Sequence, residues 1–167
     1  EMLVADETVA PTRRFDALVT HLNWNRNPLK RRKPFVLLST TTQSEAMVFP
    51  LEDRTVEPGR TAPIQIDVKQ PVVLFAGDRF IMQGFDLNPQ HGATTGGGIV
   101  IRPHPHRKRK PDTEYSAWLR ALIAASPDAR LEKEIAATGL RGAEEQWLMA
   151  QVPFSPTETR KIVSRLI

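Results

Sequence analysis

The feature that most constrains the fold is a series of short strand-like stretches between residues 15 and 101, with no helical pattern among them. In order they are FDALVTHLNW, PFVLLSTT, EAMVFPL, APIQIDVK, PVVLFAG, DRFIMQG and GGIVIR. Turn-forming Gly, Pro, Asn and Asp residues separate them. Because strands that are joined without helices pair antiparallel, the pattern indicates a barrel or a sandwich. We predict a small closed barrel.

The stretch APIQIDVK indicates which side of one strand is buried. Ile64, Ile66 and Val68 alternate with the polar residues Gln65, Asp67 and Lys69. Since successive side chains of a strand point to opposite faces, we expect one buried face and one face in water.

After Lys110 the pattern becomes helical. TEYSAWLRALIAAS has an apolar stripe with Asp112 or Thr113 as the N-cap, and ARLEKEIAATG is predicted to end near Gly139. AEEQWLMAQV precedes a strong helix start, in which Ser155 is the N-cap, Pro156 the first helical residue and Glu158 completes a capping box. These last two helices, joined through residues 152–154, are typical of a helix-turn-helix.

The two ends of the sequence lead us to expect a piece of a longer protein. EMLVA has the pattern of a last strand, and no wing sequence follows the helix-turn-helix. The chain has no cysteine, which excludes disulfides and thiolate metal sites, and no apolar run near the roughly 18 residues of a membrane span. We expect a cytoplasmic protein that does not enter a membrane, and nothing demands more than a monomer.

The distribution of charged residues suggests which class of molecule the protein binds. The net charge is +4, and the cations are concentrated in PLKRRKP and HRKRKP. Such runs are also typical of solubilising loops. Two runs that flank one β-rich region favour binding to an RNA or DNA backbone.

The glycine cluster in HGATTGGGIVI does not fit a phosphate-binding P-loop, because no Lys follows and the segment enters a strand rather than a helix. Glycines at a strand start permit a bulge, a barrel corner or the close approach of another backbone. If the approaching backbone is that of a nucleic acid, the glycines would lie against its sugar-phosphate chain, and Thr94 and Thr95 would offer hydroxyls to its phosphates.

No arrangement for catalysis is visible. None of the histidines has a convincing Asp or Ser partner nearby, and the cations beside His104 and His106 disfavour a metal pair. Asp78 is interpreted as a turn residue. Trp24 is the tryptophan best placed for an exposed role, although packing is the commoner fate of this residue type.

Three segments together resemble the third domain of bacterial selenocysteine-specific elongation factors, a branch of the elongation factor Tu-like GTPases. They are NPLKRR, RTVEPGRTAPIQIDVKQPVVLFAGDRFIM and ATTGGGIVIRPHP, and the resemblance covers about residues 1 to 110. It implies the end of a preceding barrel domain at 1–14, a six-stranded antiparallel barrel of the translation-factor domain III type at 15–108, a basic linker at 109–112, and the helical part of an incomplete winged-helix domain at 113–167.

The resemblance also implies a function. The parent protein would deliver selenocysteinyl-tRNA to the ribosome at recoded UGA codons, and later winged-helix domains would bind the mRNA insertion element. GTP and Mg²⁺ would belong to a GTPase domain outside this chain. We therefore expect no cofactor, no metal and no enzyme activity here.

The resemblance implies backbone recognition of tRNA by cations and by the segment around the glycines. The RNA-binding residues expected from the resemblance and from the two basic runs are Lys30, Arg31, Arg32, Lys33, Thr94, Gly96, Gly97, Gly98, Arg107, Lys108 and Arg109. One departure is Ala93, where relatives usually have Arg. The alternative is a DNA-binding regulator, in which the helix SPTETRKIVSRLI presents Thr157, Thr159, Arg160 and Arg165 to a groove.

Overall fold

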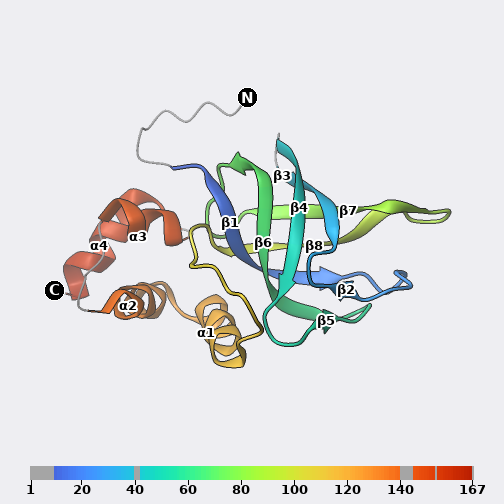
Figure 1. The fold of residues 1–167 in the computed structure, drawn as a ribbon. Helices are drawn as coiled ribbons and strands as arrows, with labels where there is room; N and C mark the ends of the chain where they lie inside the picture. The colour runs from blue at the N-terminus through green and yellow to red at the C-terminus, as the bar shows by residue number, and fades with distance from the viewer. Residues whose placement is uncertain (1–9, 40–41, 140–144, 153, 167) are drawn as a thin grey trace.

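A computed structural model describes residues 10–39, 42–139, 145–152 and 154–166. Six strands close into an antiparallel barrel in the order β1-β6-β4-β3-β7-β8, and four helices follow (Figure 1). The strands are β1 (Thr12–His21), β2 (Leu29–Lys30), β3 (Pro34–Ser39), β4 (Thr42–Pro50), β5 (Thr55–Val56), β6 (Thr61–Val72), β7 (Arg79–Asn88) and β8 (Gly92–Arg102). The helices are α1 (Thr113–Ala124), α2 (Pro127–Thr138), α3 (Glu145–Gln151) and α4 (Pro156–Leu166). The predicted six-stranded barrel with helices after it is confirmed.

The inside of the barrel is filled by the alternating apolar residues that the sequence indicates. Ile64, Ile66 and Val68 of β6 are buried in one cluster with Phe15 and Phe80, whose rings meet edge to face. The prediction for the other face of β6 is wrong at Gln65, which is 1% exposed. The chain after β8 covers this position, as described below.

Two strand boundaries differ from those expected. β1 starts at Thr12, within the segment assigned to a preceding domain, and EMLVA lies outside the described residues. PVVLFAG forms no strand of its own, since only Pro71 and Val72 continue β6. The chain then turns, because Gly77 has a φ of 93° and the Asp78 carboxylate accepts a hydrogen bond from the Phe75 amide at 2.8 Å. Asp78 is thus a turn residue, as predicted.

A small ribbon of β2 and β5 was not predicted. Leu29 pairs with Val56 and Lys30 with Thr55, and both apolar residues are buried in the barrel cluster. Strands of two residues are too short to produce an alternation that a sequence pattern would reveal.

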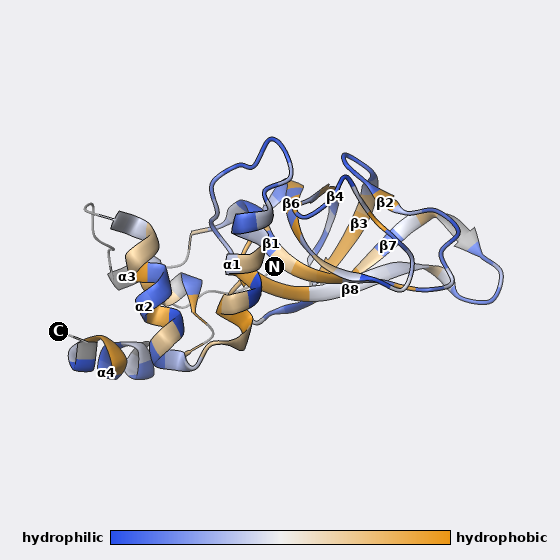
Figure 2. Ribbon diagram, turned by 90° about the horizontal axis from the view of Figure 1, so that it is seen from below, coloured by the Kyte–Doolittle hydropathy of each residue, from blue (hydrophilic) through white to orange (hydrophobic). Residues whose placement is uncertain are grey.

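Helix α1 packs against the outer side of the barrel (Figure 2). Leu119 and Leu122 are buried against Leu51 and Ile101, with Leu18 of β1 at the edge of the cluster. Asp112 caps the helix by accepting from the Tyr115 amide at 2.9 Å, which confirms one of the two expected caps.

The remaining helices form a third cluster around Leu131, Leu148, Val152 and Ile162. Helix α2 starts earlier than expected, with Ser126 as its N-cap, and ends at Gly139 as predicted. The predicted capping box before α4 is confirmed, because Glu158 accepts from the Ser155 amide at 3.0 Å and the Ser155 hydroxyl accepts from the Glu158 amide at 3.2 Å.

Candidate nucleic-acid interface

The two basic runs of the sequence meet at one groove beside the barrel. Its volume is about 340 Å³, and it collects side chains from the turn after β2, from the end of β4 with the bend that follows, and from the segment before α1. The lining residues are Arg31, Phe49, Pro50, Leu51, Arg54, Lys108, Lys110 and Pro111. Four of these eight are cations and none is an acid, so the groove attracts anions. We call it the basic groove.

The first basic run contributes through a tight turn. The Lys33 amide donates to the Lys30 carbonyl at 3.0 Å, and the Arg32 amide donates to the Val48 carbonyl at 2.8 Å. Arg32 has a φ of 63°, a conformation that non-glycine residues rarely adopt. The turn aims Arg31 at the groove, where its guanidinium lies 5.6 Å from the centroid of the Phe49 ring.

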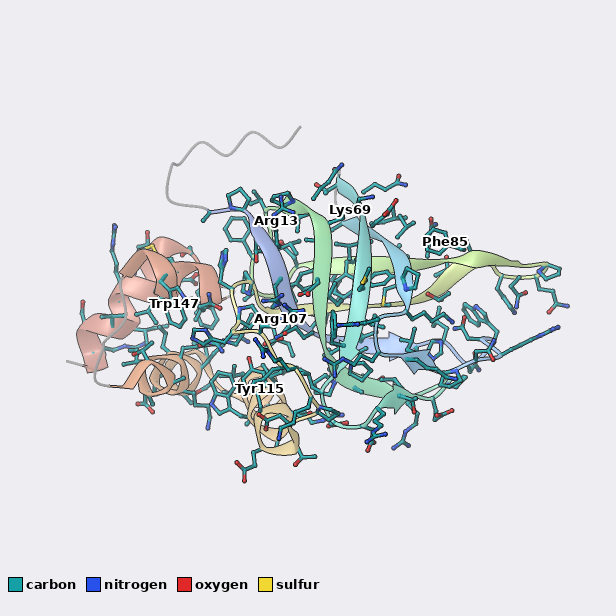
Figure 3. The ribbon with its side chains drawn as sticks, viewed as in Figure 1. Arg13, Lys69, Phe85, Arg107, Tyr115 and Trp147 are labelled. Atoms are coloured by element: carbon teal, nitrogen blue, oxygen red, sulfur yellow. The ribbon has the colours of Figure 1, made fainter. Side chains whose placement is uncertain are left out.

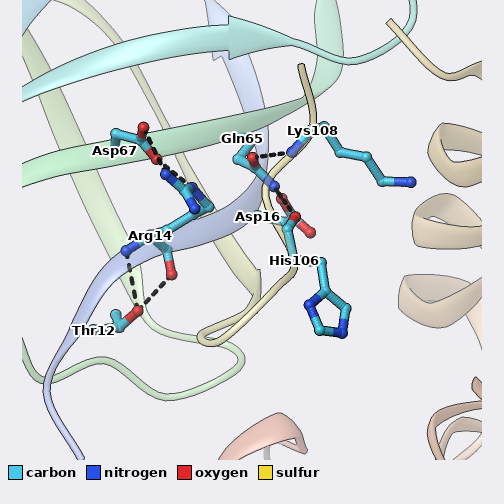
Figure 4. Close-up of polar contacts among 7 residues, drawn as sticks. All are labelled: Thr12, Arg14, Asp16, Gln65, Asp67, His106 and Lys108. Carbon is cyan, nitrogen blue, oxygen red and sulfur yellow. Dashed lines mark hydrogen bonds and ion pairs between the residues drawn. The ribbon is translucent and has the colours of Figure 1, made fainter. Parts of the chain in front are cut away.

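The second basic run is held by Gln65 (Figure 4). The Lys108 amide donates to the Gln65 side-chain oxygen at 2.8 Å, and the Gln65 amide group donates to the His106 carbonyl at 3.0 Å. The same group donates to Asp16 at 2.8 Å. Both polar groups of the buried Gln65 side chain are therefore hydrogen-bonded, and these bonds fix the path of the segment that carries Lys108.

Lys108 is also held at its side chain. Its ammonium forms an ion pair with Asp112 at 2.8 Å and lies 4.0 Å from the centroid of the Tyr115 ring. The ion pair is with the carboxylate that caps α1, and hydrogen bonding to Lys108 lowers the pKa of Asp112. One cation of the groove thus has a carboxylate neighbour within the chain.

Asp16 lies under this segment without contact to water. Its carboxylate accepts hydrogen bonds from the Tyr115 hydroxyl and from Gln65. Burial raises the pKa of Asp16 to about 6, although both hydrogen bonds act in the opposite direction. The pKa of Tyr115 is raised, first by burial and then by the charge of Asp16.

Further buried charges join the barrel to the helices. Arg102, the last residue of β8, forms a 3.0 Å ion pair with Glu134 of α2, and its guanidinium lies 4.9 Å from the centroid of the Trp118 ring. Arg130 of α2 donates to the Ile101 carbonyl at 2.7 Å and to the Gln151 carbonyl at 3.2 Å. These contacts connect the last barrel strand, α2 and α3.

The close packing of neighbouring strands explains why β8 contains three consecutive glycines. They lie inside β8, which begins at Gly92, and not at a strand start as expected. A Cβ would lie 2.6 Å from the Thr20 carbonyl oxygen at Gly96, 2.8 Å from the Phe80 carbonyl oxygen at Gly97 and 2.3 Å from the Leu18 carbonyl oxygen at Gly98. The close approach predicted for the glycines is therefore made by the barrel's own strands β1 and β7.

The glycines are also outside the basic groove. Gly97 and Gly98 line a separate, wider depression with Arg79, Ile81 and Ile99. The Thr94 carbonyl accepts from the Trp24 indole at 3.1 Å, and the Trp24 ring stacks on His91 with centroids 4.3 Å apart. Trp24 is partly buried by this packing. Phe85, which is 64% exposed, lies on the same hairpin of β7 and β8, far from the helices (Figure 3).

The structure thus divides the residues expected to bind RNA into three groups. Arg31 and Lys108 line the basic groove. Their sequence neighbours flank it without lining it, and the segment with Thr94 lies on another part of the barrel. The flanking residues are Lys30, Arg32, Lys33, Arg107 and Arg109.

Two cations of the groove were not among the residues expected to bind. Lys110 belongs to the second basic run, so the sequence alone could have indicated it as an RNA-binding residue. Arg54 stands alone in LEDRTV, and only the fold brings it beside the two runs.

Two other properties bear on function. Among residues 10–39, 42–139, 145–152 and 154–166, no group of three or more His, Asp or Glu side chains is placed to hold a metal ion. In the same ranges, every helix is too short or too polar to span a bilayer.

Comparison with known proteins gives one informative match. No protein-family model matches the chain. A selenocysteine-specific elongation factor of Desulfomicrobium baculatum is 29% identical over 142 residues, which is 85% of this chain and 22% of that protein. The chain therefore spans about a fifth of the length of this relative. The chain is a distant homologue of a selenocysteine-specific elongation factor.

Proposed function

We propose that the chain is the third-domain barrel and the first helical part of a selenocysteine-specific elongation factor, and that it holds the backbone of selenocysteinyl-tRNA. The observation that carries this proposal is the meeting of two distant basic runs at one groove with no acidic lining residue. The name of the relative supplies the factor class.

Recognition would act on phosphates rather than bases. An A-form stem has a deep, narrow major groove that side chains cannot read, so its backbone is the accessible feature. Cations at the rim of the groove and on its flanks would pair with successive phosphates. The affinity should fall steeply with salt, because each phosphate contact releases condensed counterions.

The remaining activities would belong to other parts of the parent protein. A GTPase domain would bind GTP and Mg²⁺ and perform the hydrolysis, and this chain would have no enzyme activity. Later winged-helix domains would bind the mRNA insertion element. The parent protein would act as a monomer in the cytoplasm, at the ribosome.

The test is a charge reversal at the turn after β2. Lys30→Glu with Arg31→Glu should weaken tRNA binding by the 167-residue chain and by the longer factor, and should leave the GTP affinity of the longer factor unchanged. Arg13→Glu with Lys69→Glu is the matched control, because it makes the same charge change at residues that do not line the groove. Equal tRNA affinities for wild type and the Lys30/Arg31 variant would overturn the assignment.

The second candidate is a DNA-binding regulator that uses α3 and α4. Thr157 and Arg160 are exposed on α4, as that function requires. Thr159, however, is completely buried and donates to the Ser155 carbonyl, and Arg165 forms an ion pair with Asp128 at 2.8 Å. Sequence-dependent binding to duplex DNA in preference to tRNA would favour this candidate.

A further inference from the structure

We infer that the basic groove takes a single unpaired nucleotide unit, with its phosphates on the rim cations and its base or ribose against the apolar floor. The inference rests on the proposed function and narrows it, because a tRNA stem would touch only the rim. The groove has the size of a small-ligand site, for which about 300 to 1,000 Å³ is usual.

The floor and the rim of the groove differ in chemistry. Phe49 and Pro50 come from the end of β4, Leu51 follows the strand directly, and Pro111 before α1 completes the apolar lining. The other four lining residues, Arg31, Arg54, Lys108 and Lys110, supply the cations of the groove. A nucleotide has the matching composition, since it joins a flat, weakly polar base to a phosphate.

Arg31 gives the groove a stacking surface. Its guanidinium lies over the Phe49 ring, and Arg31 itself is exposed. Bases of single-stranded RNA stack on aromatic rings and on guanidinium planes, and such stacking tolerates any base. In a duplex the bases are already stacked and paired, so a stem presents phosphates to the rim and leaves the floor unoccupied.

The walls of the groove are fixed before any ligand arrives. The Arg32 amide is bonded to Val48, the Lys108 amide to Gln65, and the Asp112 amide donates to the Leu51 carbonyl at 2.7 Å. Arg31 and Arg54 form no ion pair within the described part of the chain, so binding breaks no such pair at these two cations. Preorganisation of this kind lowers the entropy cost of binding.

The experiment compares the affinities of three ligands for the 167-residue chain by fluorescence anisotropy, with each ligand used either as a labelled probe or as a competitor. The ligands are a short oligoadenylate, a blunt RNA duplex with the same number of phosphates, and AMP. The inference predicts that the oligoadenylate binds more tightly than the duplex. Lys110→Ala should weaken oligoadenylate binding roughly fivefold or more, while Lys69→Ala, which removes a cation of β6 that does not line the groove, should change it by less than about twofold.

Arg31→Lys separates stacking from charge. It keeps the cation but removes the guanidinium plane, so oligoadenylate binding should weaken and duplex binding should stay the same. Circular dichroism and melting curves of each variant show that it is folded.

Each outcome has a definite reading. If AMP competes as effectively as oligoadenylate, and Lys110→Ala weakens the binding of both, the result would support the site and identify a free nucleotide as its ligand. If the duplex binds as tightly as oligoadenylate or more tightly, and Arg31→Lys does not change oligoadenylate binding, this inference would be overturned. The proposed recognition of the tRNA backbone would not be affected by that result. Absence of binding to all probes and to tRNA would overturn both.

Discussion

Arg102 and Glu134 form a 3.0 Å ion pair that joins the last strand of the barrel to the second helix, with exposed side-chain fractions of 9% and 0%. Glu134 also faces Arg130, whose pKa is lowered by burial and raised by the Glu134 charge. One buried carboxylate thus faces two guanidinium groups where the last barrel strand meets α2.

Glu134→Gln should destabilise the chain by about 3 kcal/mol, because it removes the buried carboxylate that pairs with Arg102 and faces Arg130, while Asp16 stays as a negative charge near Arg102. Chemical denaturation followed by circular dichroism measures this change. The double variant Arg102→Met with Glu134→Leu removes both charges of the pair and should lose less stability than Glu134→Gln alone. A double variant that is less stable than the single one would contradict this account of the pair.

Asp16→Asn should change how stability depends on pH. The folded state raises the pKa of Asp16 from 3.8 to about 6, so the folded protein holds a proton that the unfolded chain releases. Ionisation therefore opposes folding, and wild type should lose up to about 3 kcal/mol relative to the Asn variant as pH rises from about 4 to about 6.

Asp112→Asn is the control of opposite sign. Asn remains a good N-cap, so the variant tests the charge alone. Because the pKa of Asp112 is lowered in the folded state, its carboxylate stabilises the fold above its unfolded pKa and loses this effect as the pH falls. Denaturation curves across the same pH range that show no difference between the two variants would contradict both assignments.

Gly98→Ala should destabilise the barrel by about 3 kcal/mol, since its Cβ would lie 2.3 Å from the Leu18 carbonyl oxygen and 3.0 Å from the Phe80 ring. Gly92→Ala is the matched control. Gly92 has a φ of 64° and open space around it, so Ala there should cost only about 1 kcal/mol. Equal losses at the two positions would show that steric contact is not the reason for glycine in β8.

Ser155→Ala should remove the hydroxyl that accepts from the Glu158 amide and cost about 1 kcal/mol. Thermal melting should show a lower midpoint for this variant. Ser164→Ala removes a hydroxyl that donates to the Arg160 carbonyl within α4, and its midpoint should stay close to that of wild type.

The sequence could predict features that depend on neighbouring residues. The capping box of Ser155 and Glu158 and the turn at Asp78 are local, and so is the alternation of Ile64 and Ile66. Gln65 could not be assigned correctly, because its burial depends on the segment of Lys108, 43 residues later. Local pattern gives no information on such a pairing.

The basic groove was only partly predictable for the same reason. The two runs were visible as charge clusters, but Arg54 carries no local signal. The glycines were singled out correctly as unusual, while their reason, the carbonyl oxygens of β1 and β7, requires the closed barrel.

The most direct test of the central claim is the salt dependence of tRNA binding by wild type and by Arg54→Ala with Lys110→Ala. If the basic groove grips phosphates, the slope of log affinity against log salt should become shallower by about 1 to 2 in the double variant, because the contacts of two cations are lost. A slope unchanged from wild type would show that tRNA does not use this groove.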